Sequence, residues 1–167
     1  MGKTRLEAFS DGVMAVIITI MVLELKAPHA GSLADLKPLL PALMSYVLSF
    51  VYVAIYWNNH HHLLQAARTI NGRVLWVNLF LLFWLSLFPF ATNWIGESDF
   101  QAVPMALYGV IALIAGASYS HLVRELRRIP GQPEALMAAS GVDRKGILSL
   151  LGYTAGVLIS LLGFPLI

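Results

Sequence analysis

The chain has 167 residues, of which 58% are hydrophobic and only 12% are charged, and its mean hydropathy is +0.73. Soluble domains carry roughly 45–50% apolar and about 25% charged residues, so this composition indicates a protein built for a lipid bilayer. The formal net charge of +2 is too small to indicate a nucleic-acid partner, and we expect none. The absence of cysteine excludes disulfides, thiolate catalysis and cysteine-ligated metal sites.

Apolar runs along the chain predict an all-α membrane protein, since a helix crosses the hydrocarbon with about 20 apolar residues. We expect five spans within a single transmembrane domain that covers residues 1–167. The spans cover about 6–25, 38–64, 74–95, 102–123 and 146–167. We do not expect the first to be a cleaved signal, because Glu24 and Lys26 stand where a small-residue cleavage site would follow.

The links between these spans carry stop and turn signals. Pro28 stops the first span, and residues 29–37 form a polar loop after it. Asn71-Gly72 marks a turn before the third span. Pro89 interrupts the third span near its end.

The basic residues predict that the N-terminus is cytoplasmic. With this orientation the inner segments hold nine basic residues: Lys3, Arg5, Arg68, Arg73, Arg124, Arg127, Arg128, Arg144 and Lys145. Only Lys26 and Lys37 fall in the outer segments. Because cytoplasmic segments carry an excess of lysine and arginine, we expect a multi-pass protein of the cell membrane with its N-terminus inside.

The first span carries an apolar stripe along one face of its helix. Four residues of the stripe follow helical spacing, with Thr19 beside them: Val13, Val16, Ile20 and Leu23. One interpretation is ordinary packing between spans. The other is a pore wall, in which branched side chains from several subunits form a hydrophobic constriction and the threonine hydroxyl is offered to an ion.

Polar and ionisable side chains at membrane depth are costly, so they are candidate functional residues. We single out six of them within or directly beside the first three spans: Arg5, Ser10, Asp11, His60, His61 and Asn78. Arg5 and Asp11 are six residues apart and do not face each other on one helix, so we expect each to find partners across spans or subunits. We interpret all six as a structural polar network that fixes how the first span packs.

Neither a metal site nor an enzyme is expected. His60, His61 and His62 are consecutive, and consecutive helical residues point about 100° apart, so they cannot close on one ion from a single helix. The sequence has no glycine-rich phosphate loop, no nucleophile elbow and no pair of carboxylates on one face. We therefore expect no metal and no cofactor.

Four motifs follow one another in the first three spans. They are Arg5-x-x-x-Phe9-Ser10-Asp11 before an apolar run that contains Thr19, then Tyr56-Trp57-x-x-His60-His61, then Asn78-Leu79-x-Leu81-Leu82, and then Pro89-Phe90-x-Thr92. In this order they resemble the bacterial relatives of the lysosomal potassium channel, the transmembrane protein 175 family. The resemblance extends from Arg5 to about Gly156.

The resemblance implies a homotetramer of six-helix subunits, in which the first span of each lines a central pore. It implies that Val16, Ile20 and Leu23 form the constriction and that Thr19 contributes to potassium preference. This chain departs from the pattern in having five predicted spans, and in carrying Val16 where isoleucine is common. The implied function is a modestly potassium-selective cation channel that conducts passively, with potassium as the permeant ion.

Two interpretations from other functional classes stay open. A proton-coupled secondary transporter would use Asp11 and the histidines, although the sequence has no inverted repeats and no helices broken by glycine at the midplane. A non-conducting membrane scaffold would use its polar residues only to join the spans.

Overall fold

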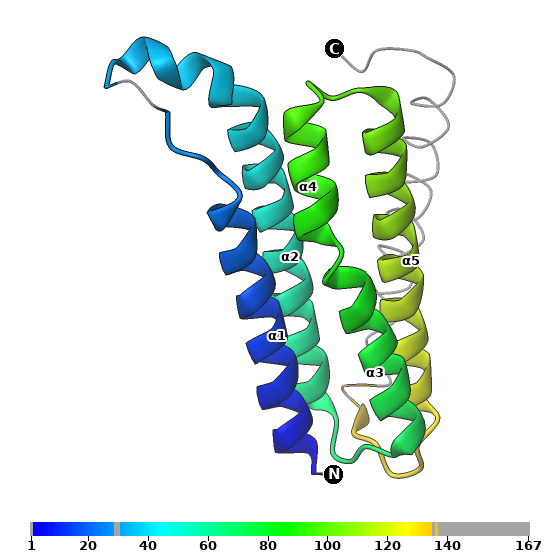
Figure 1. Cartoon of the computed structure of the whole chain (residues 1–167). Coiled ribbons are helices and arrows are strands. Elements are labelled where there is room, and N and C mark those ends of the chain that lie inside the picture. Colours follow the sequence, from blue (N-terminus) through cyan, green and yellow to red (C-terminus); the bar gives the residue numbers. More distant parts are fainter. Residues whose placement is uncertain (1, 29–30, 135, 137–167) are drawn as a thin grey trace.

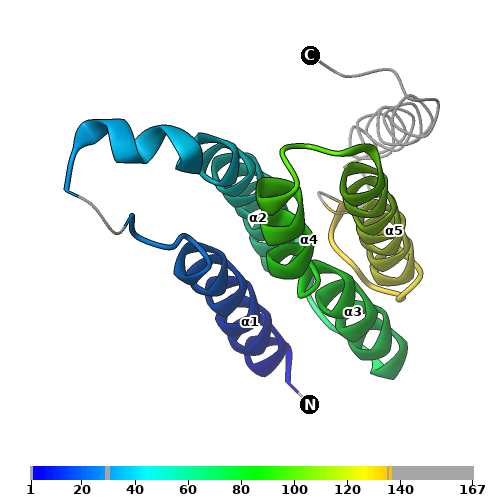
Figure 2. The ribbon, with the colours of Figure 1, turned by 45° about the horizontal axis from the view of Figure 1, so that its top comes forward.

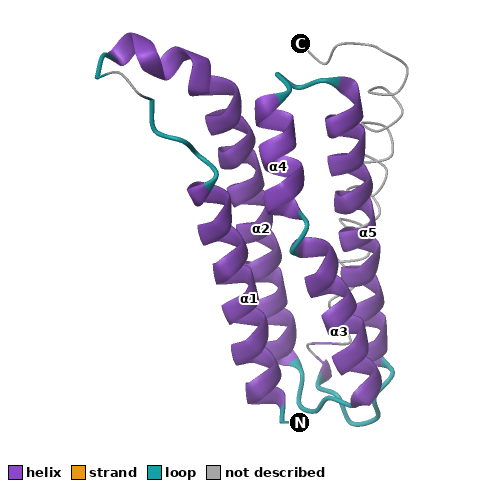
Figure 3. Cartoon of the chain, viewed as in Figure 1, coloured by secondary structure: helices purple, strands orange, loops and turns teal. Residues whose placement is uncertain are grey.

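The computed structural model describes residues 2–28, 31–134 and 136, and this part of the chain is helical and contains no strand (Figures 1 and 3). Its elements are α1 (Lys3–Leu23), the 3-10 helix η1 (Leu33–Leu39), α2 (Leu40–Ala66), α3 (Gly72–Leu85), α4 (Phe88–Glu97) and α5 (Ala102–Arg127). Four helical segments of the described chain are long and apolar enough to cross a membrane: Lys3–Leu23, Leu33–Ala66, Gly72–Glu97 and Ala102–Arg127. The fifth predicted span, 146–167, lies outside the described residues.

Local signals account for where the helices begin. The Asn71 side chain accepts a hydrogen bond from the amide of Val74 at 3.0 Å, which caps the start of α3. Ser32 and Asp35 form a capping box at the start of η1, within the stretch predicted to be a polar loop. Pro41 lies in the first turn of α2, where a missing amide hydrogen costs nothing.

The third predicted span, 74–95, is two helices rather than one. α3 ends at Leu85 and α4 begins at Phe88, so the segment bends near its middle (Figure 1). Pro89 has no amide hydrogen to give to the carbonyl of Leu85, which breaks the helical ladder. We call residues 86–89 the elbow. Within it, Ser86 Oγ donates to the carbonyl of Phe83 at 2.7 Å.

The helices form a bundle in which α3 packs on α5, α2 packs on α4, and α1 packs on α2, α3 and α4. Figure 2 shows α1 on one side of the bundle and α5 on the other, with α2, α3 and α4 between them. Phe88 anchors the elbow in the core, because it is fully buried and its ring lies 4.9 Å from the Tyr52 ring and 5.1 Å from the Tyr108 ring. Gly96 allows close approach of α4 to α2, since a Cβ there would lie 2.7 Å from Ala42 Cα.

Charge is distributed unevenly between the two ends of the bundle. The start of α1, the link between α2 and α3, and the end of α5 lie at one end (Figure 1). This end carries seven basic residues of the described chain: Lys3, Arg5, Arg68, Arg73, Arg124, Arg127 and Arg128. α5 runs to Arg127, four residues beyond the predicted limit at 123, so Arg124 and Arg127 lie on its last turn.

Candidate functional site

α1 has two different faces. Five of its residues are buried against the other helices: Leu6, Ser10, Met14, Ile17 and Met21. They recur every three to four residues, which is the spacing of one helical face. Most of the other residues of α1 are exposed, and we call this exposed surface the free face.

The residues predicted to form a pore lie on this free face. Val16, Ile20 and Leu23 are 53%, 41% and 79% exposed. Thr19 is also exposed, and its hydroxyl donates to the carbonyl of Val16 in the preceding turn at 2.9 Å. This bond uses the hydroxyl hydrogen, so the lone pairs of the oxygen are left to accept from or coordinate another group.

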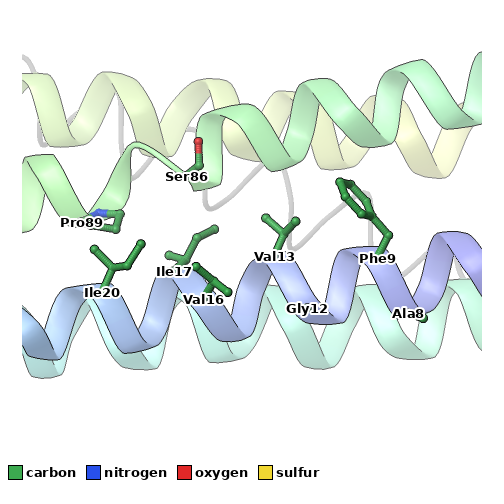
Figure 4. Close-up of a pocket in the computed structure, with 9 residues that line it drawn as sticks. All are labelled: Ala8, Phe9, Gly12, Val13, Val16, Ile17, Ile20, Ser86 and Pro89. Atoms are coloured by element: carbon green, nitrogen blue, oxygen red, sulfur yellow. The ribbon is translucent and has the colours of Figure 1, made fainter.

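A groove lies between α1 and the elbow. It has a volume of about 500 Å³ and is lined by Ala8, Phe9, Gly12, Val13, Val16, Ile17, Ile20, Ser86 and Pro89 (Figure 4). Its walls are almost entirely apolar, and the Ser86 hydroxyl is already bonded to a backbone carbonyl. The groove therefore has nothing to hold a polar ligand, but it leaves the middle of α1 loosely packed on this side.

Three of the predicted polar residues meet in the interior. The amide nitrogen of Asn78 on α3 donates to Ser10 Oγ on α1 at 2.9 Å. The amide oxygen of Asn78 lies 2.7 Å from His60 Nε2 on α2. Because that oxygen is an acceptor, Nε2 carries the proton and donates. All three side chains are 1% exposed or less, so this bonded group joins α1, α2 and α3 inside the bundle.

Asp11 and His61 belong to a separate cluster on the surface. Trp57 Nε1 donates to Asp11 Oδ1 at 2.9 Å. The Trp57 ring stacks on His61, with centroids 5.8 Å apart and an interplanar angle of 24°. Asp11 is thus bonded to a tryptophan instead of a histidine. The Arg5 side chain is exposed and has no hydrogen bond or ion pair with any residue that the structure describes.

The structure also joins polar residues whose pairing was not expected from the sequence. Thr92 on α4 donates to Ser49 Oγ on α2 at 2.7 Å, and Ser49 Oγ is hydrogen-bonded to the hydroxyl of Tyr108 on α5 at 3.1 Å. The Thr92 hydroxyl also lies 3.8 Å from Met21 Sδ on α1. Hydroxyl residues inside apolar spans were the signal for this cluster, because they are candidates for bonding between helices.

No group of three or more histidine, aspartate or glutamate side chains within the described ranges is arranged to hold a metal ion. Asp11, Ser10, Asn78 and Thr92 all take part in hydrogen bonds between helices.

Comparisons with known proteins identify the family. The family model of the endosomal/lysosomal potassium channel TMEM175 matches residues 5–89. A protein of Chryseobacterium sp. strain P1-3 named as a potassium channel is 50% identical over 94% of this chain and 82% of its own length. Another potassium channel by name, from Streptomyces collinus, is 30% identical over 97% of this chain and 84% of its own length.

The fold has a counterpart among solved structures. The crystal structure of a lysosomal potassium-selective channel TMEM175 homolog from Chamaesiphon minutus matches with a TM-score of 0.78 and 25% identity. The match covers 96% of this chain and 87% of that one. The resemblance drawn from the four sequence motifs is therefore confirmed, and the chain belongs to the TMEM175 family.

Proposed function

We propose that the chain is one subunit of a homotetrameric channel of the cell membrane that conducts cations passively and prefers potassium modestly. Its family and the names of its relatives support a cation channel and give no support to an enzyme. The potassium preference, the tetramer and the pore residues are the finer parts of the proposal.

The exposed face of α1 is the observation that carries it. Val16, Ile20 and Leu23 lie together there, although α1 is packed against three other helices of its own subunit. Gly12 and Ala15 lie on the exposed surface of the same helix, and small residues allow neighbouring membrane helices to approach closely. Four copies of such a helix can surround an axis with their apolar side chains facing inward.

The chemistry of this face limits how the pore can work. A ring of valine, isoleucine and leucine side chains gives a dehydrated ion nothing to coordinate, and narrow apolar rings close by expelling water. Conduction therefore requires the ring to widen until a partly hydrated cation passes, and discrimination between potassium and sodium is modest. Thr19 lies one residue from Ile20 and supplies the hydroxyl oxygen that contacts the passing ion.

The charge at the ends of the bundle sets the proposed orientation. The end that holds the start of α1 and the end of α5 carries most of the basic residues of the described chain. The positive-inside tendency places this end in the cytoplasm.

The test is ion flux in liposomes that contain the purified protein, with potassium and sodium gradients measured in matched preparations. We expect faster potassium flux in the wild type. Ile20→Asn should raise the flux and reduce the preference, because an amide in the ring keeps it hydrated. Thr19→Ala should reduce the preference for potassium.

Two results would contradict the proposal, and each would favour a different function. Absence of flux from folded, tetrameric protein favours the non-conducting scaffold. Uphill movement of a solute driven by a proton gradient favours the secondary transporter.

A further inference from the structure

α1 is tied to the bundle by polar contacts at two levels. At the first level, Ser10 accepts from Asn78, which is on α3 and is bonded in turn to His60. At the second level, Met21 faces the hydroxyl of Thr92, which is on α4 and donates to Ser49. Ser10 and Met21 are separated by eleven residues, which is about 16 Å along a helix.

The predicted constriction lies largely between these two levels. Val16 and Ile20 fall within the segment from Ser10 to Met21. On this segment Met14 and Ile17 are buried in the core, but the groove beside the elbow leaves another side of α1 without close packing. The contacts at the two ends of the segment therefore add to the packing that positions this part of α1.

The two ties are attached to different halves of a broken helix. Asn78 lies on α3 before the elbow, and Thr92 lies on α4 after it. The break at the elbow separates the helix that holds Asn78 from the helix that holds Thr92. At the second level Thr92 contacts both α1 and α2 from one buried position on α4.

We propose that Thr92 is a positioning residue of the channel: its buried hydroxyl, held by Ser49, sets where α1 places Ile20 and thereby sets ion preference. This inference rests on the proposed function, since Ile20 matters to permeation only if α1 lines the pore. Thr92 does not touch the ion. It acts through Ser49 and Met21.

The test compares four variants. Thr92→Val replaces the hydroxyl with a methyl group of similar size, and Thr92→Ser keeps the hydroxyl. Ser49→Ala removes its partner. Ser45→Ala is the matched control, because Ser45 is also buried and lies one turn away on α2, but its hydroxyl donates to the carbonyl of Ala42 in its own helix at 2.9 Å.

Two readouts are measured on every variant. One is the ratio of potassium to sodium flux in liposomes. The other is the rate at which a water-soluble thiol reagent modifies Ile20→Cys, which is the sole cysteine because the chain has none of its own.

We expect Thr92→Val and Ser49→Ala to change the modification rate about fivefold, which converts to about 1 kcal/mol, the contribution of one hydrogen bond. The flux ratio should change in the same variants, while Thr92→Ser and Ser45→Ala should behave as the parent chain does. Unchanged readouts in Thr92→Val, or a Thr92→Ser variant that behaves like Thr92→Val, would overturn the proposal. If Thr92→Val does not fold, Ser49→Ala against Ser45→Ala decides the question.

If the proposed function is wrong, the two readouts give a different result from the one expected when only the role of Thr92 is wrong. A wild-type protein without flux would refute the channel, whereas the modification rate at position 20 would still show whether Thr92 positions α1.

Discussion

Asn78→Leu removes the centre of the buried group that joins α1, α2 and α3. Asn78 is fully buried and makes two hydrogen bonds, to Ser10 at 2.9 Å and to His60 at 2.7 Å. A leucine side chain fits a similar space but leaves the His60 N–H without an acceptor and Ser10 without a donor. Hydrogen bonds between membrane helices contribute about 0.6 kcal/mol on average and up to about 1.7 kcal/mol. An orphaned buried group costs about 1–3 kcal/mol. We therefore expect the free energy of unfolding to fall by about 2 kcal/mol, near the middle of the range for an orphaned buried group.

Thermal unfolding of the detergent-purified protein measures this loss. A change of about 2 kcal/mol corresponds to a decrease in Tm of about 4–8 °C for a chain of this size. Asn58→Leu is the control, since Asn58 is an exposed amide on α2. Ser10→Ala should lower the Tm of Asn78→Leu by less than it lowers the Tm of the wild type. The hydrogen bond that joins these two residues is already lost in Asn78→Leu. An unchanged Tm in Asn78→Leu, or strictly additive losses in the double variant, would refute the reasoning.

Two further substitutions test the packing and the surface cluster. Gly96→Ala should lower Tm, because its Cβ would lie 2.7 Å from Ala42 Cα and force α4 away from α2; Gly72→Ala, where a Cβ meets nothing within 4 Å, should not. If Gly96→Ala has the same Tm as the wild type, then α4 and α2 do not approach as closely at Gly96 as described. Trp57→Phe removes the bond to Asp11 and should cost less than about 1 kcal/mol, because both groups are partly exposed. A loss in Trp57→Phe as large as that in Asn78→Leu would contradict the distinction between the surface cluster and the buried group.

The helical segments of the described chain follow from hydropathy because crossing a bilayer demands only length and apolar character. Their limits are less predictable. α1 covers 3–23 where 6–25 was expected, since helix ends depend on local bonding. Pro89 indicated an interruption in the third span, but its sequence position alone did not show that two separate helices would meet at 86–87.

The hydrogen-bond partners of the polar residues could likewise be predicted only in part. Ser10 and Asn78 stand out in sequence because each is polar within an apolar run, and the structure joins them to His60. Asp11 stands out equally, but its partner is Trp57, which appears in the sequence analysis only as part of a motif and not as a hydrogen-bond donor. The choice of partner depends on how separate helices are rotated against each other, and no local pattern encodes that rotation.

The hydroxyl cluster was predictable only in part, for a related reason. Ser45 and Ser49 lie one turn apart in the same apolar helix, and both are buried. Ser45 bonds within its own helix, whereas Ser49 joins Thr92 and Tyr108 across helices. A hydroxyl can always satisfy itself on a nearby carbonyl, so sequence alone does not separate the two cases.

A cysteine scan of α1 tests most directly whether its exposed face lines a pore. Single cysteines are introduced into the naturally cysteine-free chain at Val16, Ile20 and Leu23 on the free face and at Met14 and Ile17 on the buried face. Potassium flux is then measured before and after a charged, water-soluble thiol reagent is added. We expect the reagent to block flux at the three free positions and not at the two buried ones. Block confined to the buried face, or flux insensitive to the reagent at every modified position, would contradict it.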